Sequence, residues 1–292
     1  MRECLWILIA GVVMSMAISG MANAAGWSVE KLPGVYKFTE GPVWTPWGTL
    51  LFSDCHDNKI WEIVSSESGA TRKVYRDPSG PSNGLTFDKQ GRLIVCDYGN
   101  RRVTRTEKDG KITVLADKYE GKRLNSPNDV VVRSDGSIYF TDPTYGVDAA
   151  QIELGFKGVY RIKPDGKLEL LVKDFDMPNG LCFSLDESKL YIADSSGRRH
   201  ILRLKVAKNG TLSGGEVIAK FPNTGVPDGM KIGSEGNLYS SGPDGVWIFD
   251  PTGKHLETIP VPETPANLAW GDKDGKTLYI TARTSVYKAR RN

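Results

Sequence analysis

Charge of one sign, long apolar runs and helical periodicity are all scarce in this 292-residue chain. A formal net charge of +3 is too small and too scattered to indicate nucleic-acid binding, and no Pro/Ser-rich linker or low-complexity tract divides the sequence. β-branched and aromatic residues recur in short runs without a sustained 3.6-residue period, which favours an all-β chain. The basic pairs Arg101-Arg102 and Arg198-Arg199 follow expected strands, and we interpret them as solvated turns.

Histidine and cysteine are also few, which narrows the possible chemistry. The chain has three histidines and four cysteines, without the spacing of a metal site, and no Gly-x-Ser-x-Gly motif for a nucleophilic serine. Cys96 and Cys182 fall inside expected strands and are interpreted as core residues. A Cys55–Cys96 disulfide between neighbouring repeats is conceivable in an oxidising compartment but is not the favoured interpretation. The histidines are interpreted as surface or packing residues: His56, His200 and His255.

The one long apolar run, Leu5 to Ile18, has about the length of a signal-peptide core and is too short to span a bilayer comfortably. Ala22-Asn23-Ala24 follows it as a small-residue cleavage pattern. We therefore predict a signal peptide over residues 1–24 and a single domain over residues 25–292. The protein is expected to be periplasmic or secreted, with no membrane contact after cleavage. An uncleaved membrane anchor is the alternative.

A polar residue followed by a short apolar strand recurs six times, at intervals of 39 to 51 residues. Each repeat continues through an Asp-, Gly- or Lys-rich turn into a second strand and further strands. A period of about 45 residues with four short strands is typical of a β-propeller, so we predict a six-bladed β-propeller of four-stranded blades. The six motifs are Glu40-Gly41-Pro42-Val43-Trp44, Asn83-Gly84-Leu85-Thr86-Phe87, Asn128-Asp129-Val130-Val131-Val132, Asn179-Gly180-Leu181-Cys182-Phe183, Asp228-Gly229-Met230-Lys231-Ile232 and Asn267-Leu268-Ala269-Trp270.

The sixth repeat stops one strand short, after Ser285-Val286-Tyr287-Lys288. The segment from Trp27 to Leu32 precedes the first motif and has the character of a strand. Pairing this segment into the last blade closes the circle and leaves no open sheet edge. We therefore predict closure by an N-terminal strand, in preference to a loose N-terminal arm.

In a propeller the start of each innermost strand lines the central channel, so the repeat predicts a ring of six oxygen-bearing side chains on the axis. Two are carboxylates, Glu40 and Asp228. Hard oxygen ligands with two negative charges suit Ca²⁺, Mg²⁺ or Mn²⁺ rather than zinc, and Ca²⁺ is favoured. Single Asn-Gly or Asp-Gly pairs are also ordinary turn residues, but six in register are harder to explain by turn chemistry. The four amides are Asn83, Asn128, Asn179 and Asn267.

At these motifs the sequence resembles the gluconolactonase/senescence-marker-protein (regucalcin-like) family of six-bladed propellers, over essentially the whole chain after residue 24. In that family a glutamate, an asparagine and an aspartate hold a divalent cation, which the resemblance places on Glu40, Asn179 and Asp228. Asn128 then completes or abuts the site, and Asp228 also acts as the general base. The most specific matches are Glu40-Gly41-Pro42-Val43-Trp44, Asn125-Ser126-Pro127-Asn128-Asp129, Asp142-Pro143-Thr144-Tyr145-Gly146, Pro178-Asn179-Gly180 and Pro227-Asp228-Gly229.

The resemblance implies hydrolysis of a small-molecule sugar lactone, with one divalent cation as cofactor and no protein partner evident. Arg123 matches an arginine that contacts substrate in some members. Tyr145 and Arg283, on loops after second strands, are expected to line the pocket or to serve in packing. The extended segment 147–156 is a lid or merely a long loop. Two alternatives stay open: a related esterase or organophosphatase on the same ring, and a non-catalytic extracellular ligand-binding propeller.

Overall fold

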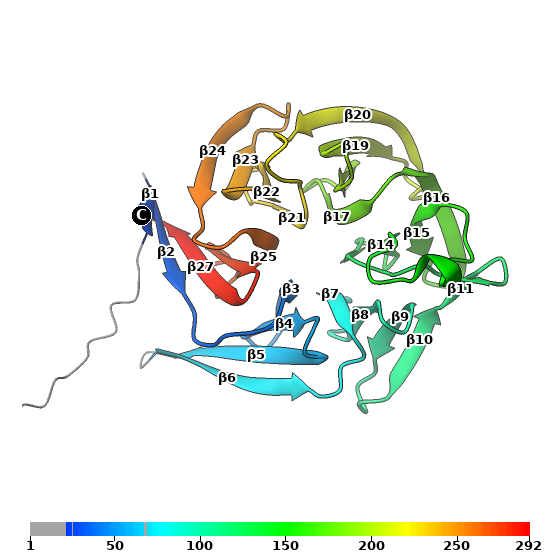
Figure 1. The fold of residues 1–292 in the computed structure, drawn as a ribbon, viewed down its shortest axis with the longest axis horizontal. Helices are drawn as coiled ribbons and strands as arrows, with labels where there is room; N and C mark the ends of the chain where they lie inside the picture. The colour runs from blue at the N-terminus through cyan, green and yellow to red at the C-terminus, as the bar shows by residue number, and fades with distance from the viewer. Residues whose placement is uncertain (1–21, 25, 67–68) are drawn as a thin grey trace, which may run out of the picture.

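The structure, a computed structural model, describes residues 22–24, 26–66 and 69–292. These residues form six antiparallel sheets arranged as blades around a central axis (Figure 1), which confirms the predicted all-β six-bladed propeller. Five sheets have four strands and the last has five. In this part of the chain we find no helix of the length and apolarity that a membrane span requires.

In each of the first three blades the strands follow one another in chain order, with the first strand nearest the axis (Figure 1). Blade one contains β3 (Thr39–Trp44), β4 (Leu50–Asp54), β5 (Lys59–Ser66) and β6 (Gly69–Arg76); blade two contains β7 (Ser82–Phe87), β8 (Leu93–Asp97), β9 (Arg102–Thr106) and β10 (Ile112–Ala116); and blade three contains β13 (Val130–Val132), β14 (Ile138–Asp142), β15 (Lys157–Ile162) and β16 (Leu168–Phe175).

The remaining three blades continue around the axis, and three short elements lie in the connections. Blade four contains β17 (Pro178–Phe183), β18 (Lys189–Asp194), β19 (His200–Val206) and β20 (Leu212–Lys220); blade five contains β21 (Met230–Ile232), β22 (Leu238–Gly242), β23 (Gly245–Phe249) and β24 (His255–Pro260); blade six contains β25 (Pro265–Gly271), β26 (Thr277–Ala282) and β27 (Ser285–Arg291); and the connecting elements are β11 (Lys118–Tyr119), β12 (Lys122–Arg123) and the 3-10 helix η1 (Ala149–Gln151).

The second strand of each blade is buried along nearly its whole length, because it lies inside its own sheet and between two neighbouring sheets. Strands β4, β8, β14 and β22 are buried at every position, whereas an outermost strand such as β6 is largely exposed. This burial explains why second strands are nearly continuous apolar runs in the sequence. Six apolar clusters fill the six interfaces between adjacent blades.

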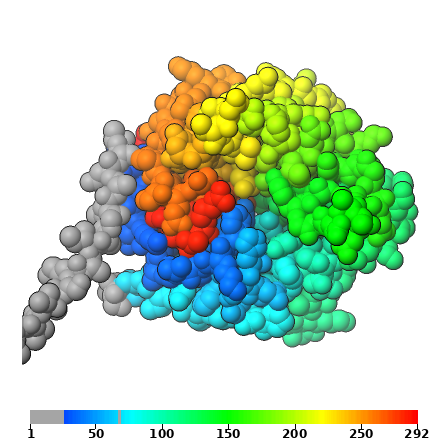
Figure 2. All heavy atoms as spheres, in the orientation of Figure 1, coloured from blue at the N-terminus to red at the C-terminus, as the bar shows by residue number. Residues whose placement is uncertain are grey.

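The N-terminal strand β2 (Trp27–Lys31) closes the last blade by pairing antiparallel with β27, from Trp27 opposite Arg291 to Lys31 opposite Tyr287. The two ends of the described chain therefore lie side by side, blue against red in Figures 1 and 2. This pairing confirms the predicted closure. Strand β1 (Ala22–Ala24) adds a fifth, outermost strand to the blade. Residues 1–21 lie outside the described residues, so the signal peptide stays a prediction.

Closure depends on packing as well as on backbone pairing, and this can be tested at Trp27. Its side chain is 3% exposed and packs edge-to-face on Tyr239 of blade five, with ring centroids 6.3 Å apart. We expect Trp27→Ala to lower the free energy of unfolding by about 3–5 kcal/mol, because it opens a cavity between the blades that the closing strand joins. Urea denaturation measures this loss. Leu185→Ala, at a position 63% exposed, is the control; an equal effect of the two changes contradicts the role given to β2.

Candidate active site on the propeller axis

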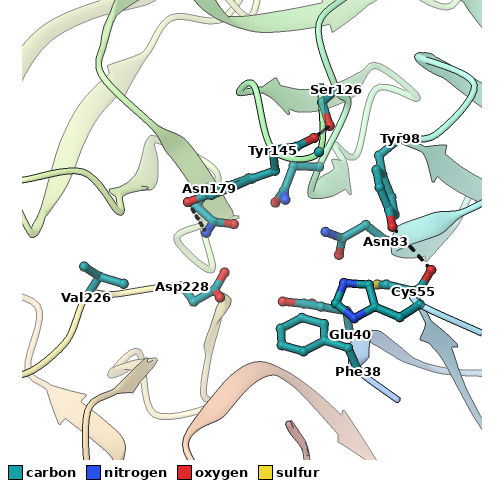
Figure 3. Close-up of a pocket in the computed structure, with 13 residues that line it drawn as sticks. Phe38, Glu40, Cys55, Asn83, Tyr98, Ser126, Tyr145, Asn179, Val226 and Asp228 are labelled. Atoms are coloured by element: carbon teal, nitrogen blue, oxygen red, sulfur yellow. Dashed lines mark hydrogen bonds between the residues drawn. The ribbon is translucent and has the colours of Figure 1, made fainter. Parts of the chain in front are cut away.

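A cavity of about 340 Å³ lies on the axis at the end where the first strands begin. Asn179 and Asp228 face Glu40 and Asn83 across it (Figure 3). The fold thus brings together five of the six predicted ring residues, from five different blades: Glu40, Asn83, Asn128, Asn179 and Asp228.

Asn267, the sixth predicted ring residue, lies one residue further along its strand than the other five and does not line the cavity. Its N–H donates to the Thr281 hydroxyl (3.1 Å), and its own side-chain oxygen accepts the Leu268 N–H (2.8 Å). Asp129, the residue after a ring position, makes the same two bonds in blade three. Ala266 therefore occupies the ring position of blade six, and the prediction of Asn267 on the ring was wrong by one residue. The repeat pattern in the sequence does not distinguish Ala266 from Asn267 as the ring residue. The hydrogen-bond register of the first strand does.

Glycines close the channel below the cavity. A Cβ on Gly41 would lie 2.0 Å from the backbone oxygen of Asn83, and one on Gly229 would lie 2.1 Å from the Asn267 side chain. Only glycine permits such close approach of neighbouring first strands. In the same layer the Lys231 ammonium lies 3.0 Å from the Met230 carbonyl oxygen and 3.4 Å from Asn267 Oδ1.

The two ring carboxylates, buried Glu40 and half-buried Asp228, lie close enough for each charge to affect the other. Burial, with the nearby Asp129 charge, raises the pKa of Glu40 to about 7, and burial beside Glu40 raises the pKa of Asp228 well above its ordinary value. Glu40 accepts the Gly41 N–H (2.7 Å), but among the described residues neither carboxylate forms an ion pair. Two carboxylates beside neutral amides form a donor set that could hold a divalent cation.

The donor set fits a hard cation rather than zinc. Within residues 22–24, 26–66 and 69–292, no group of three or more His, Cys, Asp or Glu side chains is placed to hold a metal. The cavity instead offers two carboxylates and amide oxygens, the ligands that Ca²⁺ accepts readily. Glu40, Asn179 and Asp228, with Asn128, are the residues able to hold such an ion.

Hydrogen bonds fix the blade-four and blade-five side of the site. The Asn179 amide nitrogen donates to Ser195 Oγ (2.9 Å), and this hydroxyl donates to the Pro227 carbonyl oxygen (2.5 Å). The backbone N–H of Asp228 donates to the Ser241 hydroxyl (3.0 Å). With its nitrogen held in this way, Asn179 turns its amide oxygen into the cavity (Figure 3).

A second network fixes the segment that carries Asn128. Asp142 accepts the backbone N–H groups of Asn125 (2.8 Å) and Ser126 (2.7 Å) on its two carboxylate oxygens. Arg101 Nε donates to the carbonyl oxygens of Leu124 (2.6 Å) and Asn125. The interpretation of Arg101 as a solvated turn residue was wrong, because its guanidinium is buried and satisfies backbone carbonyls of the next blade.

The sequence analysis missed an aromatic wall at the cavity. Phe38 and His56 stack with ring centroids 5.2 Å apart, and both line the cavity with Tyr98. His56 was interpreted as a surface or packing residue, but its exposed ring faces this cavity. Their positions in the sequence could have indicated this wall. Phe38 directly precedes the first motif, and His56 follows the second strand of the same blade.

Cys55 also lines the cavity, and it is a free, buried thiol. Burial and the Glu40 charge raise the pKa of this thiol well above its ordinary value. A thiol in this environment stays protonated, so it is not an activated nucleophile. Cys96 and Cys182 are free and buried as well, in agreement with their interpretation as core residues, and no Cys55–Cys96 disulfide forms.

The three predicted substrate contacts outside the ring have different positions. Tyr145 lines the central cavity. Arg283 lines an adjoining cavity of about 200 Å³. Arg123 lines neither; it is exposed on β12, and its guanidinium donates to the Asn100 carbonyl oxygen (3.1 Å). The segment 147–156 contributes nothing to the walls of the two cavities, and its Leu154 packs between blades two and three.

Buried Glu40 gives the metal-free protein a specific pH dependence. Its folded-state pKa of about 7 lies above its ordinary value of 4.5, so the stability it contributes is complete below about pH 4.5 and is lost as the pH rises through 7. We expect the melting temperature of the chelated protein to fall between pH 5 and pH 8, and to fall less in Glu40→Gln. Differential scanning calorimetry measures both slopes; equal slopes contradict the assignment of this ionisation to Glu40.

Comparisons with known proteins agree with this fold. A family profile described as "SMP-30/Gluconolactonase/LRE-like region" matches residues 38–284. A gluconolactonase of Zymomonas mobilis is 35% identical over 90% of this chain and 81% of its own length. Regucalcin of Xenopus laevis is 30% identical over 85% of this chain and 83% of its own. The solved structure of a gluconolactonase from Xanthomonas campestris superposes with a TM-score of 0.84 at 35% identity, covering 91% of this chain and 90% of that one.

Proposed function

This chain belongs to the SMP-30/gluconolactonase/LRE-like family and is a homologue of gluconolactonase, and from this membership we propose that it is a metal-dependent hydrolase of sugar lactones. The observation that carries the proposal is the pair of ring carboxylates: Glu40 lines the axial cavity on the side opposite Asp228 and Asn179 (Figure 3). A cavity of about 340 Å³ has the size of a small-molecule site and accommodates a single sugar ring.

Glu40, Asn179 and Asp228 would hold the divalent cation, with Asn128 as a further ligand or a neighbour. When bound there, a cation would supply Lewis-acid chemistry, which polarises a lactone carbonyl and stabilises an oxyanion. Ca²⁺ is favoured, because carboxylate and amide oxygens surround the site and no imidazole belongs to the proposed ligand set.

Asp228 is proposed as the general base that takes a proton from the attacking water. Contact with the cation would lower the basicity of this carboxylate but would hold it beside the attacking water. Asn128 and the Tyr145 hydroxyl line the same cavity and are proposed to orient the lactone by hydrogen bonds. Water is the nucleophile in this scheme, since the only thiol in the cavity, that of Cys55, stays protonated.

We also propose that the protein is exported. Cleavage after Ala24 would remove β1, and the last blade would then have four strands like each of the other five. Detection of a mature protein beginning at Ala25, by N-terminal sequencing of the periplasmic or secreted fraction, tests this. Recovery of the full-length chain from membranes contradicts it.

The function is tested by a screen of aldonolactones, with acid release followed at constant pH. The proposal expects ring opening above the spontaneous rate by the metal-loaded protein. Hydrolysis of phosphotriesters or simple aryl esters instead of lactones would favour a related esterase or organophosphatase on the same ring. Saturable sugar binding without turnover of any of these substrates would favour a ligand-binding propeller.

A further inference from the structure

We propose that Arg283 forms a subsite for an anionic group, so that the preferred lactone carries a carboxylate or phosphate in addition to its ring ester. This inference rests on the proposed lactone hydrolysis and adds the chemical class of the substrate to it. Four observations carry it: a side cavity, an arginine without an acidic partner, a rigid turn, and the charge of the site.

The side cavity opens beside the reacting centre. It has a volume of about 200 Å³ and shares three lining residues with the axial cavity: Phe38, Val226 and Asp228. Arg283 also lines this side cavity. A substrate whose ester lies at Asp228 can therefore extend a second group toward Arg283 without leaving the site.

The Arg283 guanidinium has no acidic partner among the residues that the structure describes. The guanidinium lies over the ring of Phe38, with Cζ 6.0 Å from the ring centroid. Glu263 packs against the same turn, but one of its oxygens accepts the Thr284 N–H and hydroxyl (both 2.9 Å) and the other accepts the Tyr287 hydroxyl (3.0 Å). The nearby carboxylate is thus engaged elsewhere, and the guanidinium remains available for a ligand.

The backbone at Arg283 is fixed in a conformation that arginine does not favour. Arg283 begins the two-residue turn between β26 and β27 with φ of 45°, where asparagine or glycine is preferred. Its carbonyl oxygen accepts the Thr39 N–H (2.8 Å), and the Thr284 carbonyl oxygen accepts the Tyr36 N–H (2.9 Å). A strained arginine on a rigid turn beside a site indicates a function for its side chain.

The charge of the site gives that function a reason. Two carboxylates and one divalent cation would give the loaded floor of the cavity no net charge, so the floor neither repels nor selects an anion. The Arg283 guanidinium at the rim would supply that selection, since it can form two parallel hydrogen bonds to a carboxylate or a phosphate.

The experiment compares kcat/KM for three lactones: neutral gluconolactone, glucarolactone with its carboxylate, and phosphogluconolactone. We expect the metal-loaded protein to prefer one anionic lactone over the neutral one by about 10-fold or more, and the preferred anion identifies the group. Arg283→Gln should lower this preference about 10–100-fold, mainly through KM, which is the effect of removing a hydrogen bond to a charged group. Arg283→Lys keeps the positive charge but cannot form two parallel hydrogen bonds. Its preference for the anionic lactone should lie between that of the wild type and that of Arg283→Gln.

Two further variants separate this role from charge and folding. Lys273→Gln removes the same charge from the turn at the opposite end of β26 and should leave the preference unchanged. Arg283→Asn should lose the preference while its melting temperature is no lower than that of the wild type, because asparagine suits a positive φ. Equal kcat/KM for neutral and anionic lactones, or an equal loss in Lys273→Gln, overturns the subsite and leaves lactone hydrolysis standing. A wild-type protein that hydrolyses no lactone overturns the proposed function itself.

Discussion

Replacing Asp228 by asparagine should lower kcat for lactone hydrolysis by about 10²–10⁴-fold, and the loss should persist at saturating divalent cation. Asparagine keeps an oxygen for the metal but cannot accept a proton from water. The substitution also preserves the size of the side chain, and the Asp228 N–H keeps its bond to the Ser241 hydroxyl (3.0 Å). Initial rates measured over a titration of Ca²⁺ separate kcat from metal affinity.

Glu40→Gln is the matched control for this result. Glu40 is proposed as a ligand only, so its amide variant should chiefly weaken metal binding, and excess cation should recover part of the rate. Rescue of both variants to the same extent would show that Asp228 is a ligand only and that the base lies elsewhere. If neither change affects any hydrolysis, the reaction does not use this ring.

Removal of the metal should abolish activity, and a divalent cation should restore it. The charged side chains of the ring are carboxylates, and the Lys231 ammonium lies below them, so no cationic side chain of the described ring could replace the metal. Dialysis against EDTA followed by titration with Ca²⁺, Mg²⁺ and Mn²⁺ gives both the requirement and the preference. Full activity in a chelated sample, with metal loss verified by elemental analysis, rules the site out as catalytic.

The same titration should change stability. A ligand that binds only the native state stabilises it by about 2.7 kcal/mol at a free concentration one hundred times its Kd. We therefore expect the melting temperature to rise with cation concentration in the wild type and to rise less in Glu40→Gln at equal concentration. A rise of the same size in both proteins would indicate that the cation binds away from the ring.

The sequence by itself determined the architecture. Six repeats, each with a polar residue before a short strand and an Asp/Gly turn after it, are local patterns. Each of the first five blades folds by pairing strands that are neighbours in the chain. Closure by Trp27–Lys31 followed from counting strands, because an unpaired edge in the sixth blade needs a partner. Glu40, Asn128, Asn179 and Asp228 could be predicted for the same reason, since a repeat places equivalent residues at equivalent depths around the axis.

Only the tertiary structure decided which residues complete the site. Asn267 fell one layer too deep, because the depth of a side chain in the channel depends on hydrogen-bond register. Phe38 and His56 form a wall through a contact between a loop and a strand end of the same blade, which has no repeating pattern in the sequence. Arg101 and Arg283 are both arginines in turns with positive φ, yet one is buried against backbone carbonyls and the other faces a cavity. Their neighbours come from other blades, and so only the closed ring of blades separates a structural arginine from one that is free to bind substrate.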